Sequence, residues 1–111
     1  HTNSVTSLIM NKDNELISTS LDKTIKIWNM KTGQVRITLA GHRFRVNSLI
    51  INKENELISG SYQEIKVWNM TTGEVKRTLI GHSSYIYSLV INQNDELISG
   101  SSDHTIKIWN M

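Results

Sequence analysis

Short apolar runs separated by polar turns cover most of the chain. In the middle of the chain these runs lie at residues 46–51, 56–61, 65–68 and 75–79, and residues 65–68 alternate between apolar and polar with a period of two. An alternation with this period is typical of a β-strand that is buried on one face. The pattern predicts four short antiparallel strands joined by turns, which together form a meander in an all-β protein.

The sequence contains three copies of one unit of this kind. Trp28, Trp68 and Trp109 stand 40 and 41 residues apart, and the sequence Glu-Leu-Ile-Ser precedes each of them. Gly-His opens the second and third units at residues 41–42 and 81–82, and His1 stands at the equivalent position of the first. A single meander cannot bury both of its faces, whereas stacked copies can. We therefore predict an array of stacked units.

Composition supports strands and turns over helices. Ile, Val and Thr make up 31 of the 111 residues, and alanine occurs once. β-branched side chains suit a pleated sheet. Because proline is absent, the turns depend on other residues. Gly33 and Gly73 follow the tryptophan strands, and Asn14 and Asn55 stand in the preceding turns. We predict a positive φ at these four positions, which glycine adopts freely and asparagine tolerates.

The repeated unit resembles the WD-40 repeat, whose family forms β-propellers. The features that carry the resemblance are a Gly-His pair and, about 25 residues later, a strand that ends in Trp-Asp, at a period of about 40–45 residues. Here Gly41-His42 leads to Trp68-Asn69, and Gly81-His82 leads to Trp109-Asn110. Asn replaces the Asp of the dipeptide in all three units. The resemblance covers essentially all 111 residues.

The resemblance implies a partial β-propeller over residues 1–111. Its blades are expected at about residues 1–39, 41–79 and 81–111, each a four-stranded antiparallel meander, with the third lacking its outermost strand. Propellers close with about 4–8 blades. We therefore expect either an arc of a longer protein or copies that assemble into a ring, and favour the arc. Either open end would otherwise expose an apolar sheet face.

In this family a His, a Ser or Thr, an Asp and the Trp form a buried hydrogen-bonded network within each blade. Such groups are costly to bury unpaired. The resemblance assigns this structural role to His1, Ser18, Asp22 and Trp28, to His42, Ser59 and Trp68, and to His82, Ser99, Asp103 and Trp109.

The second unit has no such Asp because its turn is one residue shorter, Ser61–Ile65 against Ser101–Ile106. Either Gln63 or Glu64 takes its place, or His42 binds water. We predict that the second blade is the least stable.

The repeated His, Ser and Asp do not predict an enzyme. A catalytic triad is needed once, whereas this set recurs at the structural period and includes a Trp, and no Gly-x-Ser-x-Gly sequence occurs. The histidines are about 40 residues apart without further ligands at metal-binding spacing. We expect His104, in a turn, to be solvated. No catalytic residue, metal or cofactor is assigned.

Charge and cysteine content limit the classes of partner and the cellular compartment that the sequence favours. The 12 basic and 10 acidic residues give a net charge of +2, too mild to argue for nucleic acid or a membrane surface. No apolar run is long enough to span a bilayer. The absence of cysteine excludes disulfides and, for a propeller segment, favours the cytoplasm.

The most variable positions lie on one expected rim of the propeller. In this family the loop after Gly-His and the turn before the Trp strand share that rim, and loops on a rigid scaffold carry function. Arg and Tyr are enriched at interface hot spots. The candidate partner-binding residues are Leu21, Arg43, Phe44, Arg45, Asn47, Tyr62, Tyr85 and Tyr87.

These residues favour a non-catalytic scaffold that binds partner proteins or peptides at the Gly-His rim. One alternative is a phosphate-bearing ligand, such as a phosphopeptide, a nucleic acid or a lipid headgroup, held by Arg43 and Arg45. The other is an accessory propeller of a larger multidomain enzyme.

Overall fold

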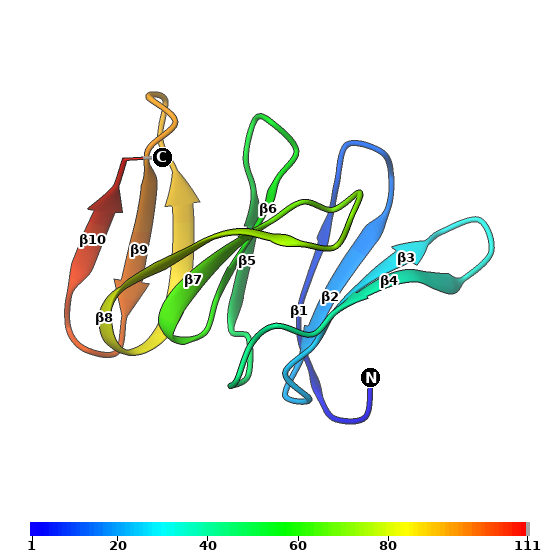
Figure 1. Ribbon diagram of the computed structural model, residues 1–111, viewed down its shortest axis with the longest axis horizontal. Coiled ribbons are helices and arrows are strands. Elements are labelled where there is room, and N and C mark those ends of the chain that lie inside the picture. The colour runs from blue at the N-terminus through cyan, green and yellow to red at the C-terminus, as the bar shows by residue number, and fades with distance from the viewer. Residues whose placement is uncertain (111) are drawn as a thin grey trace.

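The computed structural model describes residues 1–110, which form three β-blades standing side by side (Figure 1). Blade one consists of β1 (Val5–Met10), β2 (Leu16–Ser20), β3 (Ile25–Asn29) and β4 (Gln34–Leu39). Blade two consists of β5 (Ser48–Ile51), β6 (Leu57–Gly60), β7 (Tyr62–Trp68) and the first part of β8 (Val75–Ile91). The rest of β8, with β9 (Leu97–Ser101) and β10 (Ile106–Trp109), forms blade three. The prediction of an all-β fold built from antiparallel meander blades is confirmed.

The strands pair in chain order and always antiparallel. β1 to β4 form one sheet, and the second sheet has the order β10-β9-β8-β7-β6-β5. Within residues 1–110 no helix is long and apolar enough to cross a bilayer. The Gly-His segments and the turns before the tryptophan strands lie at one end of the blades, the lower end in Figure 1. We call this end the Gly-His rim.

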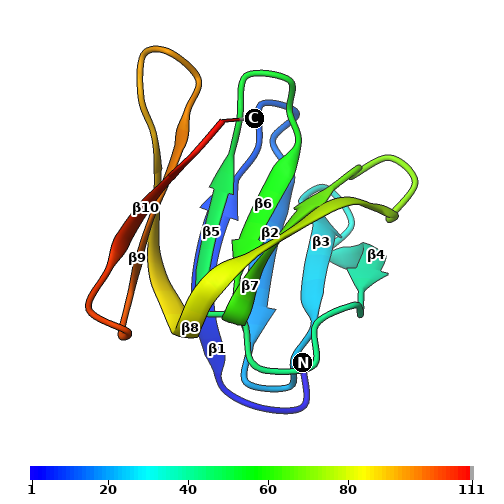
Figure 2. The same cartoon turned by 60° about the vertical axis from the view of Figure 1, so that its left-hand side comes forward.

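Blades two and three share one continuous strand, β8. Its first part, predicted as a separate strand at residues 75–79, pairs with β7, and its last part pairs with β9. Between these parts Tyr85 pairs with Tyr62 at the start of β7. The short turn of the second unit allows this pairing because β7 begins at Tyr62. Figure 2 shows β8 as the yellow-green band that crosses between the two blades.

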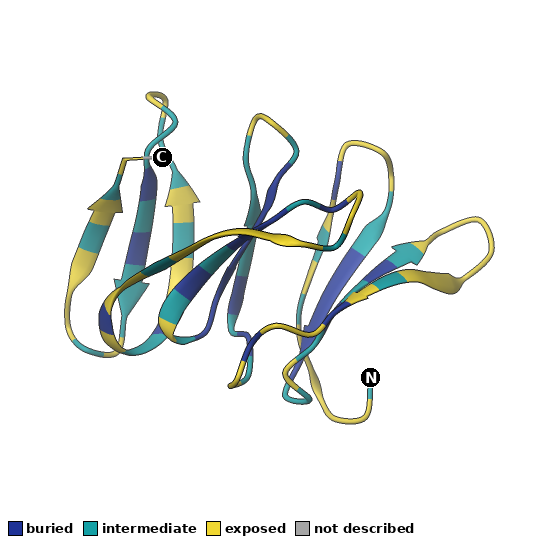
Figure 3. Cartoon of the chain, viewed as in Figure 1, coloured by how far each residue is buried: buried dark blue, intermediate teal, exposed yellow. Residues whose placement is uncertain are grey.

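The core lies between the blades (Figure 3). Ile17, Ile25 and Ile27 of blade one pack against residues of blade two that include Leu57 and Trp68. A second cluster joins blades two and three and consists of Ile58, Ile65, Val67, Ile86 and Leu97. Each blade thus buries its β-branched residues against its neighbour, as predicted for stacked meanders.

The turns adopt the predicted backbone conformations. Asn14 and Asn55 have φ values of 61°, and Gly33 and Gly73 have φ values of 72° and 80°. In the short turn of blade two, Gln63 also has a positive φ, 66°. The left-handed conformation reverses the chain within very few residues at each of these positions.

Candidate functional site

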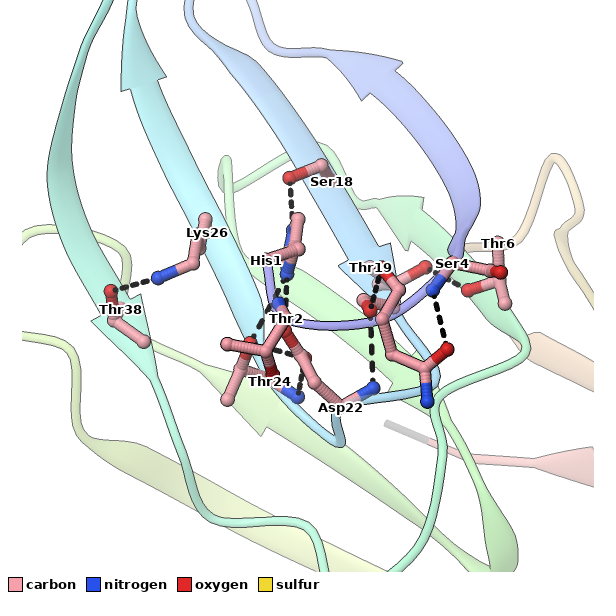
Figure 4. A network of polar contacts seen from close by, with 12 residues as sticks. His1, Thr2, Ser4, Thr6, Ser18, Thr19, Asp22, Thr24, Lys26 and Thr38 are labelled. Carbon is pink, nitrogen blue, oxygen red and sulfur yellow. Dashed lines mark hydrogen bonds and ion pairs between the residues drawn. The ribbon is translucent and has the colours of Figure 1, made fainter.

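A network of hydrogen bonds at the Gly-His rim ties blade one together (Figure 4). Trp28 Nε1 of β3 donates to Ser18 Oγ of β2 at 2.8 Å. Ser18 Oγ also lies 2.6 Å from His1 Nε2. Because an ionised carboxylate can only accept, the neutral imidazole carries its hydrogen on the nitrogen that faces Asp22, and Ser18 donates to Nε2. The imidazole proton then lies on Nδ1, which donates to Asp22 Oδ2 at 2.9 Å.

The carboxylate of Asp22 also connects the first loop to the β2–β3 turn through hydrogen bonds. It accepts hydrogen bonds from the backbone nitrogens of Thr2 and Thr24, at 3.0 and 2.9 Å, and from the Thr24 hydroxyl. Partial desolvation raises the pKa of Asp22, but the hydrogen bonds from Thr24 and Thr2 outweigh it and lower that pKa. The carboxylate therefore stays ionised.

Blade three repeats this arrangement. Trp109 Nε1 donates to Ser99 Oγ at 2.8 Å, and Ser99 Oγ lies 2.7 Å from His82 Nε2. His82 Nδ1 and the backbone nitrogen of Ser83 both donate to Asp103 Oδ2 at 2.9 Å. The hydroxyl of Thr105 donates to Asp103 as well, and this hydrogen bond is the main cause that lowers the pKa of Asp103.

Blade two has the inner half of the network without the outer half. Trp68 Nε1 donates to Ser59 Oγ at 2.8 Å, and Ser59 Oγ lies 2.6 Å from His42 Nε2. His42 Nδ1 is buried and has no hydrogen-bond partner within residues 1–110. Glu64 Oε1 lies 3.5 Å from this nitrogen, beyond good hydrogen-bond length. Of the substitutes expected for the missing Asp, the structure brings Glu64 near the ring without bonding to it.

The surroundings of His42 keep its imidazole neutral. Burial, with a smaller contribution from the positive charge of Lys66, lowers the pKa of His42 to about 3. Because Glu64 also lies 3.7 Å from Lys66 Nζ, the three side chains form a compact polar group beneath the rim. His104, by contrast, is exposed in the turn before β10.

The glycine of each Gly-His pair has a packing role that sequence reasoning did not identify. A Cβ atom at Gly41 would lie 2.9 Å from Trp68 Cη2, and one at Gly81 would lie 2.9 Å from Trp109 Cη2. The indole therefore lies directly against the glycine backbone. The constant spacing between Gly-His and Trp in the sequence could have indicated this contact.

The opposite rim carries a second repeated feature that sequence reasoning missed. In the turn after the first strand of each unit, an Asn side chain donates to the carboxylate of a Glu four residues later and accepts from that residue's backbone nitrogen. The pairs are Asn11 and Glu15, Asn52 and Glu56, and Asn92 and Glu96. The signal was present as an Asn-x-x-x-Glu pattern at the repeat period.

Asn29 and Asn69 explain why Asn serves in place of Asp after the tryptophan. The side-chain oxygen of Asn29 accepts from the backbone nitrogens of Lys31 and Thr32, and Asn69 does the same in blade two. Only an acceptor oxygen is needed for this turn, and an amide supplies it as an aspartate would.

Four candidate aromatic residues form a continuous row across blades two and three. The ring centroids of Phe44 and Tyr62 are 4.9 Å apart, as are those of Tyr62 and Tyr85, and Tyr87 follows 6.2 Å from Tyr85. The Arg45 guanidinium lies 4.5 Å above the Tyr85 ring, and it donates to Tyr87 Oη at 3.4 Å. We call these five residues the aromatic row.

A groove of about 450 Å³ adjoins the row on blade two. The loop of Gly41, the short turn and the adjacent part of β8 surround it. Its lining residues are Gly41, Arg43, Phe44, Tyr62, Gln63, Glu64, Lys66 and Ile80. The groove therefore has apolar, basic and acidic walls.

Of the three candidate residues outside the row, Arg43 lines the groove, and the other two lie outside both. Leu21 is in the β2–β3 turn of blade one, where its backbone nitrogen bonds to Ser4 O. Asn47 precedes β5, and its buried Nδ2 atom has no hydrogen-bond partner within residues 1–110. Over the same residues, no three His, Cys, Asp or Glu side chains gather in a way that could hold a metal ion.

Comparison with known proteins supports the resemblance drawn from the sequence. The family described as WD domain, G-beta repeat matches residues 1–29, 33–69 and 73–110. No match was found among the curated proteins.

Solved structures match over the whole chain. The WD40 β-propeller domain of Doa1 is 28% identical with a TM-score of 0.93, and the chain covers 38% of its length. The structure of U3-55K is 25% identical with a TM-score of 0.92, and 37% of it is covered. The computationally designed Ika4 protein is 37% identical with a TM-score of 0.88, and 68% of it is covered. The chain thus spans under two-fifths of the Doa1 and U3-55K structures.

Proposed function

Because this chain belongs to the WD40 repeat family, we propose that it is a non-catalytic scaffold that binds segments of partner proteins at its Gly-His rim. WD40 propellers generally mediate protein–protein interactions. The observation that carries the proposal is the aromatic row, which gathers Phe44, three tyrosines and Arg45 on one rim.

The chemistry of the row suits a protein partner. Aromatic rings and Arg are enriched at interface hot spots, and charged residues other than Arg are depleted there. Tyrosine offers a large contact area with few rotatable bonds, so little entropy is lost on binding. Phe44 is 43% exposed and Tyr87 is 51% exposed, which leaves ring surface for a partner to cover.

The hydrogen-bonded networks support a structural role for the repeated His, Ser and Asp. Ser59 and Ser99 are fully buried, and each hydroxyl is held between an indole and an imidazole. A nucleophilic serine has to reach a substrate, and these two are closed off from solvent.

The contacts of Arg45 disfavour the phosphate alternative. Its guanidinium is engaged with the ring of Tyr85 and the hydroxyl of Tyr87, so a bidentate phosphate contact would require these interactions to break. Arg43 alone would then supply the charge.

The test compares proteins captured from lysate by the wild-type chain and by a double variant, Arg45→Ala with Tyr85→Ala. A matched control changes two exposed residues of the opposite rim, Lys12→Ala with Lys31→Ala. We expect the rim variant to lose partners that the control retains, with unchanged circular dichroism for both. An identical set of captured proteins for all three chains would refute the assignment of the rim.

A further inference from the structure

Blade two differs from its neighbours at one point of the Gly-His rim. In blades one and three an aspartate carboxylate accepts hydrogen bonds from a histidine Nδ1 and from the backbone nitrogen that follows this histidine. These aspartates, Asp22 and Asp103, connect the first loop to the turn. In blade two the turn is one residue shorter and contains no aspartate.

The donors that this carboxylate would satisfy are still present in blade two. The His42 side chain is only 1% exposed, and its Nδ1–H has no partner within residues 1–110. Arg43 is the sequence equivalent of Thr2 and Ser83, whose backbone nitrogens donate to their aspartates, and it is exposed in blade two. A buried N–H without a partner is costly, so the position favours an acceptor.

The charges around this position leave room for one anion. Arg43 and Lys66 line the groove with positive charge, and Glu64 contributes one negative charge. His42 is neutral, so the net charge is one positive. Glu64, which lines the groove, has its Oε1 atom 3.5 Å from His42 Nδ1 and 3.7 Å from Lys66 Nζ, so a ligand carboxylate reaches His42 by displacing Glu64 from the ring.

We propose that blade two binds an aspartate side chain of a partner peptide in the groove, at the position that Asp22 and Asp103 fill in the other blades. His42 Nδ1 and the Arg43 backbone nitrogen donate to its carboxylate, and the Arg43 and Lys66 side chains neutralise it. This inference rests on the proposed function, because it names the chemistry of a partner at the same rim.

The apolar wall of the groove determines what should flank this aspartate. Phe44, Tyr62 and Ile80 line the groove beside the charged groups, and Ile80 is one of the most exposed apolar side chains of the protein, at 73%. Burying such surface favours binding by an amount that grows with the apolar area covered. A leucine-sized side chain next to the aspartate would cover this wall.

The donors at this position and the charge of the groove favour a carboxylate over a phosphate. The two other copies show the carboxylate held by neutral N–H and O–H donors and a histidine, without any Arg or Lys contact. A dianionic phosphate would exceed the single positive charge of the groove. Inorganic phosphate therefore serves as the competing probe.

The test titrates the chain with N-acetyl-Leu-Asp-amide and with its isostere N-acetyl-Leu-Asn-amide, followed by NMR of the Arg43 amide and the His42 ring nitrogens. We expect saturable shifts of both groups with the Asp ligand and binding of the Asn ligand that is roughly tenfold weaker. Equal affinity of the two ligands, or tighter binding of inorganic phosphate, would overturn the proposal.

A matched variant replaces Gln63-Glu64 by Asp-His-Thr, the sequence of residues 103–105, and so supplies the carboxylate from within the chain. This variant keeps Tyr62 and should lose the response to the Asp ligand. If its response equals that of the wild type, the ligand binds elsewhere and the proposal fails. The dipeptide titration requires no natural partner, so its outcome does not depend on the lysate experiment. If the dipeptide does not bind, the rim can still bind a partner of other chemistry; if the lysate experiment fails, the dipeptide result remains valid.

Discussion

The incomplete network of blade two predicts that a longer turn stabilises the protein. Replacing Gln63-Glu64 by Asp-His-Thr adds the carboxylate that blades one and three possess. In blade three this carboxylate accepts from His82 Nδ1 and the Ser83 nitrogen, both at 2.9 Å. The corresponding donors in blade two are His42 Nδ1, which is buried without a partner within residues 1–110, and the backbone nitrogen of the exposed Arg43.

The size of the effect follows from the burial of His42. Providing a partner for a buried N–H is worth about 1–3 kcal/mol. The replacement removes the contact of Glu64 with Lys66, a partly exposed pair at 3.7 Å that is worth about 0–1 kcal/mol. The longer loop also gives up the pairing of Tyr62 with Tyr85, and we expect the surface hydrogen bonds of the new loop, of the kind that Asp103 makes with Thr105, to offset this loss. The expected net gain is about 1–2 kcal/mol, which corresponds to a rise in Tm of roughly 5–10 °C for a domain of this size.

Thermal unfolding monitored by circular dichroism at pH 7 measures this gain. The control carries Asn-His-Thr in place of Gln63-Glu64, which has the same loop length but no charge. We expect the Asp loop to be more stable than both the control and the wild type. Equal Tm values for the Asp and Asn loops would show that loop length, and not the carboxylate at His42, determines the stability of blade two.

Three further predictions concern the same networks. Gly81→Ala should destabilise the protein by about 1–3 kcal/mol, because its Cβ would lie 2.9 Å from Trp109 Cη2; Gly100→Ala, whose Cβ meets its nearest atom at 3.7 Å, should cost much less in chemical denaturation. The lowered pKa of Asp103 means that its carboxylate stabilises the fold above the unfolded-state pKa of about 3.9. The advantage of the wild type over Asp103→Asn should therefore shrink as pH falls below about 4 in urea titrations, and a constant difference would count against the network. The pKa of His42 is lowered to about 3 in the folded protein, below its unfolded value of about 6.5. The unfolded chain therefore binds a proton that the folded protein does not, and the free energy of unfolding should decline as the pH falls from 6.5 towards 3. In urea titrations a His42→Gln variant should lack this part of the decline.

The repeat made most of the fold predictable from the sequence. Three concordant copies fix which positions are equivalent, so the strands, the positive φ of Gly33 and Asn14, and the stacking of blades followed from pattern and turn chemistry. The continuity of β8 did not follow. It depends on the pairing of Tyr62 with Tyr85, a contact between two units that arises from the shortened turn and has no equivalent elsewhere among residues 1–110.

The candidate site was predictable in composition but not in geometry. The variable rim positions identified Phe44, Tyr62 and Tyr85, and the structure brings their rings into contact. Sequence reasoning could not show that Arg45 lies over Tyr85, because its direction depends on the path of the loop before β5. It also left open which residue faces His42, since the reach of Glu64 depends on a turn whose Gln63 adopts a positive φ.

The position of the rim site within the arc makes its geometry independent of what covers the two outer blade faces. Ile25 and Ile65 are fully buried against the next blade, whereas Ile106, at the same position in blade three, is 75% exposed. Ile86 is fully buried against blade two, and its equivalent Val5 is 52% exposed. The outer faces thus have the chemistry of the two halves of an interface that the chain forms internally twice. The aromatic row and the groove belong to blades two and three, which β8 joins by continuous hydrogen bonding. A partner at this site therefore meets a surface held by the inner junction.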